Sequence, residues 1–145
     1  MIDSESAIYL AGFVDGEGCI LINKRRVNDH HNSQYILVLA IGTTSFEIIP
    51  FLKSLGFYTC KGKAKNRPEH WKDLWLARIS DKKAKDLLIA MLPYLKIKKE
   101  HAKLAIEFQD RKSNYKAGTK GNSEEELQYR ELIRTRIQEL NRRGK

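Results

Sequence analysis

Cysteine is scarce in this sequence of 145 residues: Cys19 and Cys60 are its only thiols, and no C-x-x-C spacing occurs. Two cysteines alone cannot build a four-ligand zinc site, so we expect reduced, half-buried thiols in an intracellular protein. No apolar run approaches the ~18 residues of a membrane-spanning helix, and the N-terminus lacks a signal or transit pattern. We therefore expect no membrane partner and a location in a prokaryotic cytoplasm or an organelle.

Acidic residues are too few to balance the basic ones. The chain has 27 Lys and Arg against 18 Asp and Glu, a net charge of +9. Such an excess is typical of a protein with a polyanionic partner, most often nucleic acid, although a basic protein without one is the alternative. The sequence also lacks a Ser/His/Asp arrangement, a phosphate-cradling glycine loop and a third metal ligand near His30 and His31. We interpret these two histidines as facing nucleic acid or solvent.

The stretch Leu10–Gly18, LAGFVDGEG, is the most informative part of the chain. Gly12 and Gly16 are four residues apart, so they share one face of the predicted helix, where another backbone can approach closely. Gly16 and Gly18 are expected to end this helix in the left-handed conformation. Glu17 then lies at the negative end of the helix dipole, where a carboxylate needs a cation. If two copies pair through the glycine face, their Glu17 carboxylates meet and a divalent metal would satisfy both.

Hydrophobic periodicity and turn residues divide the rest of the chain into helices and strands. Ser4 or Ser6 is expected to cap the first helix. Thr44 and Glu47 have the spacing of a capping box, which predicts a short helix that ends at Gly56, unless Pro50 delays the start of that helix. A second box, Ser123 with Glu126, is expected to begin the last helix, with Leu132 facing inward and Arg130 outward. We expect strands at 19–26, 34–41, from 58 and at 71–79. We expect helices from a cap at Ser80 or Asp81 to a stop at Pro93, at about 99–109 and at 123–143.

Basic residues recur with period two in the second predicted hairpin. In a strand, Lys61, Lys63, Lys65 and Arg67 would all point to one side. The small residues between them could not form a core face, so we expect an arm that projects beyond the core. The facing of the returning strand, 71–79, is left open by its pattern.

The stretch Leu10–Gly18 resembles the signature of the LAGLIDADG homing endonucleases at all nine positions in character. The segment 92–98, LPYLKIK, is similar to the family's LPFLKLK-type connector. The element order matches the family's αββαββα core over roughly residues 6–109. The resemblance implies an α+β fold with a four-stranded antiparallel saddle. It would form a single domain, 1–145, completed by a C-terminal loop and helix at about 111–143.

The resemblance also implies a site. Glu17 would be the metal-binding acid, with the Gly16 carbonyl as a further ligand, for Mg²⁺ or for Mn²⁺ or Ca²⁺ in its place. Lys98 would be the basic residue near the scissile phosphate, its alternative being a surface lysine. Thr43 or Thr44 stands where some members order water. A single signature in a short chain implies a homodimer, with an interface at Ala11, Gly12, Asp15 and Gly16, of which Asp15 is expected to be structural.

The activity implied is a metal-dependent double-strand break in a long, pseudo-palindromic DNA target, by an enzyme encoded in an intron. The free face of the sheet would lie in the DNA major groove, although a solvated sheet edge is the alternative for its lysines. Two rival functions on the same scaffold are an RNA maturase that helps its intron splice and a catalytically inactive DNA-binding protein. The residues expected to contact DNA are Leu21, Asn23, Arg25, Gln34, Ile36, Val38, Lys61, Lys63, Lys65, Asp73 and Trp75.

Overall fold

The computed structural model describes residues 2–26, 30–62, 68–69 and 71–142. The predicted α+β class and αββαββα order are confirmed, and two further helices follow. The elements are α1 (Ser4–Glu17), β1 (Gly18–Arg25), η1 (His30–Asn32), β2 (Gln34–Thr43), η2 (Phe46–Ile48), α2 (Ile49–Ser54), β3 (Tyr58–Lys61), β4 (Trp75–Ser80), α3 (Asp81–Met91), α4 (Lys99–Asn114) and α5 (Glu124–Arg142).

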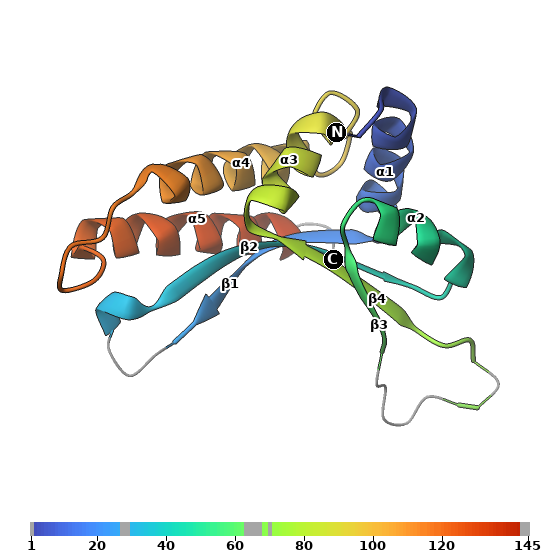
Figure 1. Cartoon of the computed structure of the whole chain (residues 1–145), viewed down its shortest axis with the longest axis horizontal. Helices are drawn as coiled ribbons and strands as arrows, with labels where there is room; N and C mark the ends of the chain where they lie inside the picture. The colour runs from blue at the N-terminus through green and yellow to red at the C-terminus, as the bar shows by residue number, and fades with distance from the viewer. Residues whose placement is uncertain (1, 27–29, 63–67, 70, 143–145) are drawn as a thin grey trace.

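The four strands form one antiparallel sheet in the order β1-β2-β4-β3. The long strand β2 pairs with β1 over Gln34–Ile41 and with β4 over Val38–Thr43. The sheet curves into a saddle, with all the α-helices on its convex side and the two hairpins pointing away from them (Figure 1). The concave side is therefore the free face of the sheet.

Strand residues alternate between these two faces. The covered face carries apolar side chains with little or no exposure, including Ile20, Ile22, Leu37, Leu39, Ile41, Ala77 and Ile79. They form one cluster with helix residues such as Leu10, Leu88 and Phe108. Each fully buried Ile, Leu or Phe side chain contributes about 1.5–3 kcal/mol, so the sheet and the helices stabilise each other.

Both ends of α1 differ from the sequence expectation. Asp3, rather than Ser4 or Ser6, is the N-cap, and its carboxylate accepts the N–H of Ser6 at 2.8 Å. Gly18 is extended, with φ −93°, and not left-handed. A Cβ at Gly18 would lie 2.9 Å from Val14, so glycine is needed for close approach rather than for backbone freedom.

The short helix α2 begins later than the box at Thr44–Glu47 indicates. Residues 46–48 form a 3₁₀ turn, and Pro50 then stands in the first turn of α2, where its missing N–H costs nothing. Gly56 follows the helix with φ +99°, as its predicted role as a helix stop requires.

The last helix is capped as predicted, since the Ser123 hydroxyl accepts the N–H of Glu126 at 3.2 Å. Two predicted orientations on α5 are wrong. Arg130 was expected outside but is buried against the equally buried Glu126, with Nε 3.0 Å from the carboxylate. Leu132 was expected inside but is 56% exposed. Within the described residues, no helix is both long and apolar enough to cross a membrane.

Candidate active site and DNA interface

Asp15 joins the end of α1 to the connector before α4. Its carboxylate accepts three backbone N–H groups, from Lys96 at 2.8 Å, Ile97 at 3.2 Å and Lys98 at 2.9 Å. Burial raises the pKa of Asp15, but these N–H groups and the charge of Lys98 outweigh it, so the net pKa lies below its ordinary value. Asp15 thus orders the LPYLKIK segment of its own chain. These contacts were not predicted when Asp15 was assigned to a dimer interface.

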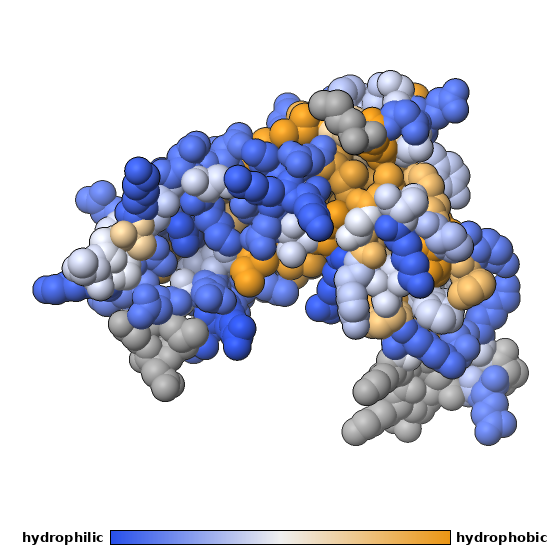
Figure 2. Space-filling view, in the orientation of Figure 1, coloured by the Kyte–Doolittle hydropathy of each residue, from blue (hydrophilic) through white to orange (hydrophobic). Residues whose placement is uncertain are grey.

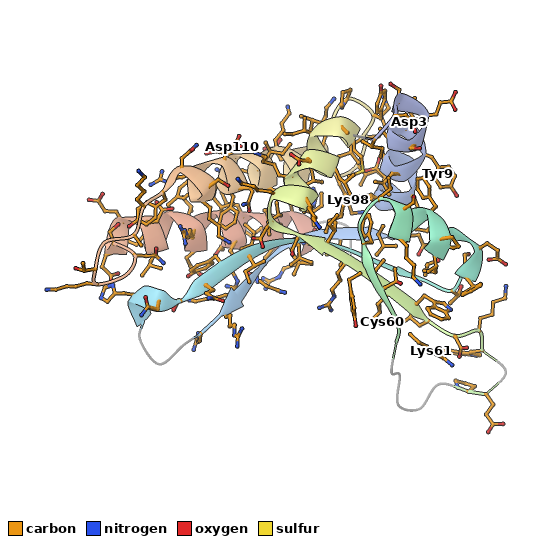
Figure 3. The ribbon with its side chains drawn as sticks, in the orientation of Figure 1. Asp3, Tyr9, Cys60, Lys61, Lys98 and Asp110 are labelled. Atoms are coloured by element: carbon orange, nitrogen blue, oxygen red, sulfur yellow. The ribbon has the colours of Figure 1, made fainter. Side chains whose placement is uncertain are left out.

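Lys98 is half-buried, and its ammonium donates to the main-chain carbonyl of Asp15 at 2.8 Å. That carbonyl lies in the last turn of α1, so the ammonium also meets the negative end of the helix dipole. The side chain of Lys98 points toward this region, near the start of β1 (Figure 3). The positive charge is therefore held within two residues of Glu17, and Lys98 is not a freely solvated lysine.

Glu17 is the last residue of α1 and is exposed, as is Gly16 before it. One carboxylate and nearby main-chain carbonyls are oxygen donors, the type that Mg²⁺ and Ca²⁺ prefer. Among the residues that the structure describes, no three His, Cys, Asp or Glu side chains could hold a metal together. Within this described part of one chain, Glu17 is therefore not accompanied by two further side chains of these types.

The exposed side of α1 has little side-chain cover. A Cβ at Gly12 or Gly16 would meet nothing within 4 Å. Ile8, one turn before Gly12, is 51% exposed, and Ile97, whose N–H reaches Asp15, is 70% exposed. Figure 2 shows hydrophobic surface concentrated where α1, α2 and α3 meet, whereas the surface over α4 and α5 is mostly hydrophilic. Ala11, which we expected on this side, is completely buried in the chain's own core.

The register of the sheet identifies the residues of its free face. Leu21, Asn23, Arg25, Gln34, Ile36 and Val38 lie there as expected, although Val38 is only 7% exposed between its neighbours. On β3 and β4 the residues of this face differ from those expected from the sequence. Residues directly opposite each other share a face, so the free face also carries Ala40, Tyr58, Cys60, Leu76, Arg78 and Ser80. Cys60 is seen on the side of the sheet away from the helices (Figure 3).

Two residues expected on the free face, Trp75 and Lys61, do not lie there. Trp75 is on the covered side and packs against Phe46, with ring centroids 5.2 Å apart. Lys61 is directly opposite Trp75 and so points to the same side, where it forms an ion pair with Asp73 at 3.1 Å. The facing of β4 was the open question, and burial of Ala77 and Ile79 decides it. Lys63 and Lys65, like Arg67, lie outside the described residues.

Thr43 and Thr44, the candidates for ordering water, differ in their surroundings. Thr43 is 5% exposed, and its hydroxyl accepts the N–H of Ser45 at 3.0 Å, so it shapes the turn after β2. Thr44 is exposed. Only Thr44 therefore has a hydroxyl that solvent can reach freely.

The end of α5 packs beside the same region. Asn141 donates to the carbonyl of Ile20 at 3.2 Å. His101, on the first turn of α4, is buried, and burial together with the charge of Lys98 lowers its pKa. Burial raises the pKa of the Cys19 thiol, which lies two residues after Glu17. Asn141 and His101 therefore pack beside the ends of α1 and of the connector, whereas Cys19, directly opposite Ala40, shares the free face of the sheet.

No protein-family model matches this sequence, and no curated protein matches it. Solved structures do. The homing endonuclease I-CvuI, in complex with DNA, has a TM-score of 0.72 and 23% identity over 94% of this chain and 82% of its own. The archaeal intron-encoded homing endonuclease I-Vdi141I, also in complex with DNA, has a TM-score of 0.72 and 14% identity over 94% and 84%. The homing endonuclease I-TnaI has a TM-score of 0.55 and 19% identity over 99% of both chains.

At these identities the likeness concerns the fold. The chain has the fold of the LAGLIDADG homing endonucleases, which confirms the resemblance that the LAGFVDGEG and LPYLKIK stretches indicated.

Proposed function

We propose that this chain is a site-specific, metal-dependent DNA endonuclease that acts as a homodimer. The observation that carries the proposal is the junction of α1 and β1. Glu17 is an exposed acid at this junction, and the ammonium of Lys98 is bonded to the Asp15 carbonyl two residues before it. Strand β1 of the concave sheet begins at the next residue, Gly18. Solved structures with this fold include DNA complexes of homing endonucleases, which favours duplex DNA as the partner.

Duplex DNA fits the free face in shape and charge. The saddle is concave, and its free face carries exposed Asn23, Arg25, Gln34 and Arg78. An eight-residue strand such as β1 spans about 26 Å, which corresponds to roughly eight base pairs of duplex. Two copies would therefore read a target of about twice that length with two-fold symmetry.

Two features support the proposal of a homodimer, namely the single Glu17 carboxylate at the end of α1 and the exposed side of that helix. Ile8, Gly12, Gly16 and Ile97 form an apolar strip with no bulky side chain over the two glycines. Packing of this strip on its own copy would remove apolar surface from water and bring the ends of the two α1 helices together. Each Glu17 would then supply the carboxylate that the other lacks.

Glu17 and the Gly16 carbonyl would hold the divalent cation, Mg²⁺ in the first instance. When bound, such a cation lowers the pKa of water and stabilises charge on phosphate oxygens. Lys98 would place a second positive charge near the attacked phosphate, since its ammonium has donors left after the bond to Asp15. Thr44 remains the candidate for ordering water.

The test is cleavage of duplex DNA that carries the uninterrupted host gene, with Mg²⁺ or with EDTA. We expect cleavage with Mg²⁺ only, and Glu17→Gln should abolish it while DNA binding in Ca²⁺ is retained. Glu47→Gln, at another exposed acid, is the matched control and should cleave normally. Unchanged cleavage by Glu17→Gln would contradict the proposal, as would tight binding of the intron RNA without any DNA cleavage.

A further inference from the structure

The loop between α4 and α5 is bonded to the tip of the first hairpin. The N–H of Asn122 donates to the carbonyl of His31 at 2.9 Å. The ring Nδ1 of His31 donates in return to the carbonyl of Asn122 at 3.1 Å, and Glu124 lies 3.8 Å from the same nitrogen. Two segments about 90 residues apart in sequence are thus joined by reciprocal hydrogen bonds. Figure 1 shows this loop beside the turn η1, at the end of the sheet far from α1.

Gly121 makes this contact possible. Its φ is +90°, and a Cβ there would lie 2.8 Å from both the Asn32 side-chain oxygen and the His31 carbonyl. Any larger residue would therefore push the loop off the hairpin. Gly118, in the same loop, offers a comparison, because a Cβ there would meet nothing within 4 Å.

The same hairpin is anchored a second time on α5. The Tyr35 hydroxyl donates to the Glu131 carboxylate at 2.8 Å, and the Lys24 ammonium lies 3.6 Å from the same carboxylate. The second hairpin has a contact of another kind, because the Lys61–Asp73 ion pair, at 3.1 Å, joins the end of β3 to the segment just before β4 of the same hairpin.

We propose that the α4–α5 loop fixes the position of the first hairpin on DNA and so sets the base specificity of the target positions that β1 and β2 read. Gly121, Asn122 and His31 are positioning residues in this account. A hairpin that is already held in its binding geometry loses less conformational freedom on binding. Its side chains cannot adjust to a mismatched base, so a mismatch weakens binding more. The inference rests on the proposed function, because it concerns the same DNA interface.

The first experiment needs no DNA. Gly121→Ala and Gly118→Ala are compared with the wild type in the full-length protein by hydrogen–deuterium exchange of residues 30–36. We expect exchange in this segment to rise roughly fivefold in Gly121→Ala, the effect of losing about one hydrogen bond, and to stay unchanged in Gly118→Ala. His31→Ala, which removes one bond without a clash, serves as a second variant should Gly121→Ala fail to fold. Equal exchange in all four proteins would overturn the inference.

The second experiment measures specificity by position. Duplexes with a random 24-base-pair segment are selected for binding in Ca²⁺, and the base preference at each position is compared between proteins. Asn23→Ala and Gln34→Ala mark the positions read by the first hairpin, and Arg78→Ala marks those read by β4. We expect Gly121→Ala to lower preference roughly fivefold at the first set only, and Gly118→Ala to leave both sets unchanged.

The outcomes separate the two proposals. If Gly121→Ala and His31→Ala both lower the base preference equally at all positions, or at no position, the positioning role is overturned while DNA recognition stands. A wild-type protein that enriches no duplex at all would contradict the proposed function itself, and the positioning role on DNA with it.

Discussion

Lys98 and Asp15 bond to each other twice. The Lys98 ammonium donates to the Asp15 carbonyl at 2.8 Å, and the Lys98 backbone N–H donates to the Asp15 carboxylate at 2.9 Å. The first bond fixes the charge of Lys98 at the end of α1, and the second fixes the turn from which α4 begins. The two signature-like stretches, LAGFVDGEG and LPYLKIK, therefore form one structural unit.

Asp15→Asn should destabilise the protein without unfolding it. An amide can present one oxygen to the three N–H groups, and its NH₂ group is repelled by the others. We expect a loss of about 1.5–3 kcal/mol in the free energy of unfolding, as for hydrogen bonds to a charged group. Urea denaturation measures it, and Glu139→Gln, at an exposed position of α5, is the control with no expected change. Equal stability of Asp15→Asn and wild type would show that the three bonds contribute nothing net.

The same pair of proteins should differ in acid sensitivity. The pKa of Asp15 lies below its ordinary value of 3.8 in the folded chain, so the carboxylate contributes stability above about pH 4. That contribution is lost as the pH falls through the folded pKa, because protonation removes it. The stability difference between wild type and Asp15→Asn should thus be constant from pH 7 to 5 and shrink below pH 4. A difference that grows on acidification would contradict the assigned sign.

Lys98→Met keeps the backbone bond to Asp15 and removes the ammonium. If Lys98 stabilises charge at the phosphate, the single-turnover cleavage rate should fall roughly 10²-fold while the DNA dissociation constant changes little. Lys96→Met, two residues earlier and exposed, is the control. Equal rates for both variants would reduce Lys98 to a structural residue.

Gly12→Arg tests the homodimer. The single chain has room for the side chain, and arginine favours a helix by about 1 kcal/mol over glycine, so the isolated chain should not be destabilised. The variant should nevertheless be monomeric by sedimentation equilibrium, because the arginine would occupy the space of the partner helix. Gly118→Arg adds the same side chain at another open glycine and should stay dimeric. A dimeric Gly12→Arg would place the interface elsewhere.

Arg78→Ala tests the orientation of β4. Arg78 is exposed on the free face, opposite Ala40 and Tyr58. Its loss should weaken DNA binding by about 1–3 kcal/mol per protomer, and lower the slope of log K against log salt by roughly one if the contact is to phosphate. Lys103→Ala removes an exposed cation of α4, in the helix layer, and should bind as the wild type does. Equal weakening by both variants would indicate non-specific attraction alone.

The order of elements and the candidate acid were readable from the sequence because they depend on local patterns. The continuous apolar run at 35–41 predicted β2, and the period of two along a strand predicted the shared face of Leu21, Asn23 and Gln34. The glycines of LAGFVDGEG predicted an uncovered helix side, and Gly12 and Gly16 are uncovered. The cap of α1 was assigned to Ser4 or Ser6 instead of Asp3 because all three residues have the side-chain chemistry of an N-cap.

Tertiary structure decided what no local pattern could. The sides of Trp75 and Lys61 depend on how β4 pairs with β2 and on Phe46, which lies far from both in sequence. Arg130 is buried beside Glu126, one turn earlier on α5, whose carboxylate also binds Arg111 of α4, and the tip of the first hairpin is held by a loop some 90 residues away. Amphipathic spacing indicates which residues can face a core. The packing of distant segments decides which partner each residue faces, and which cations stay exposed for DNA.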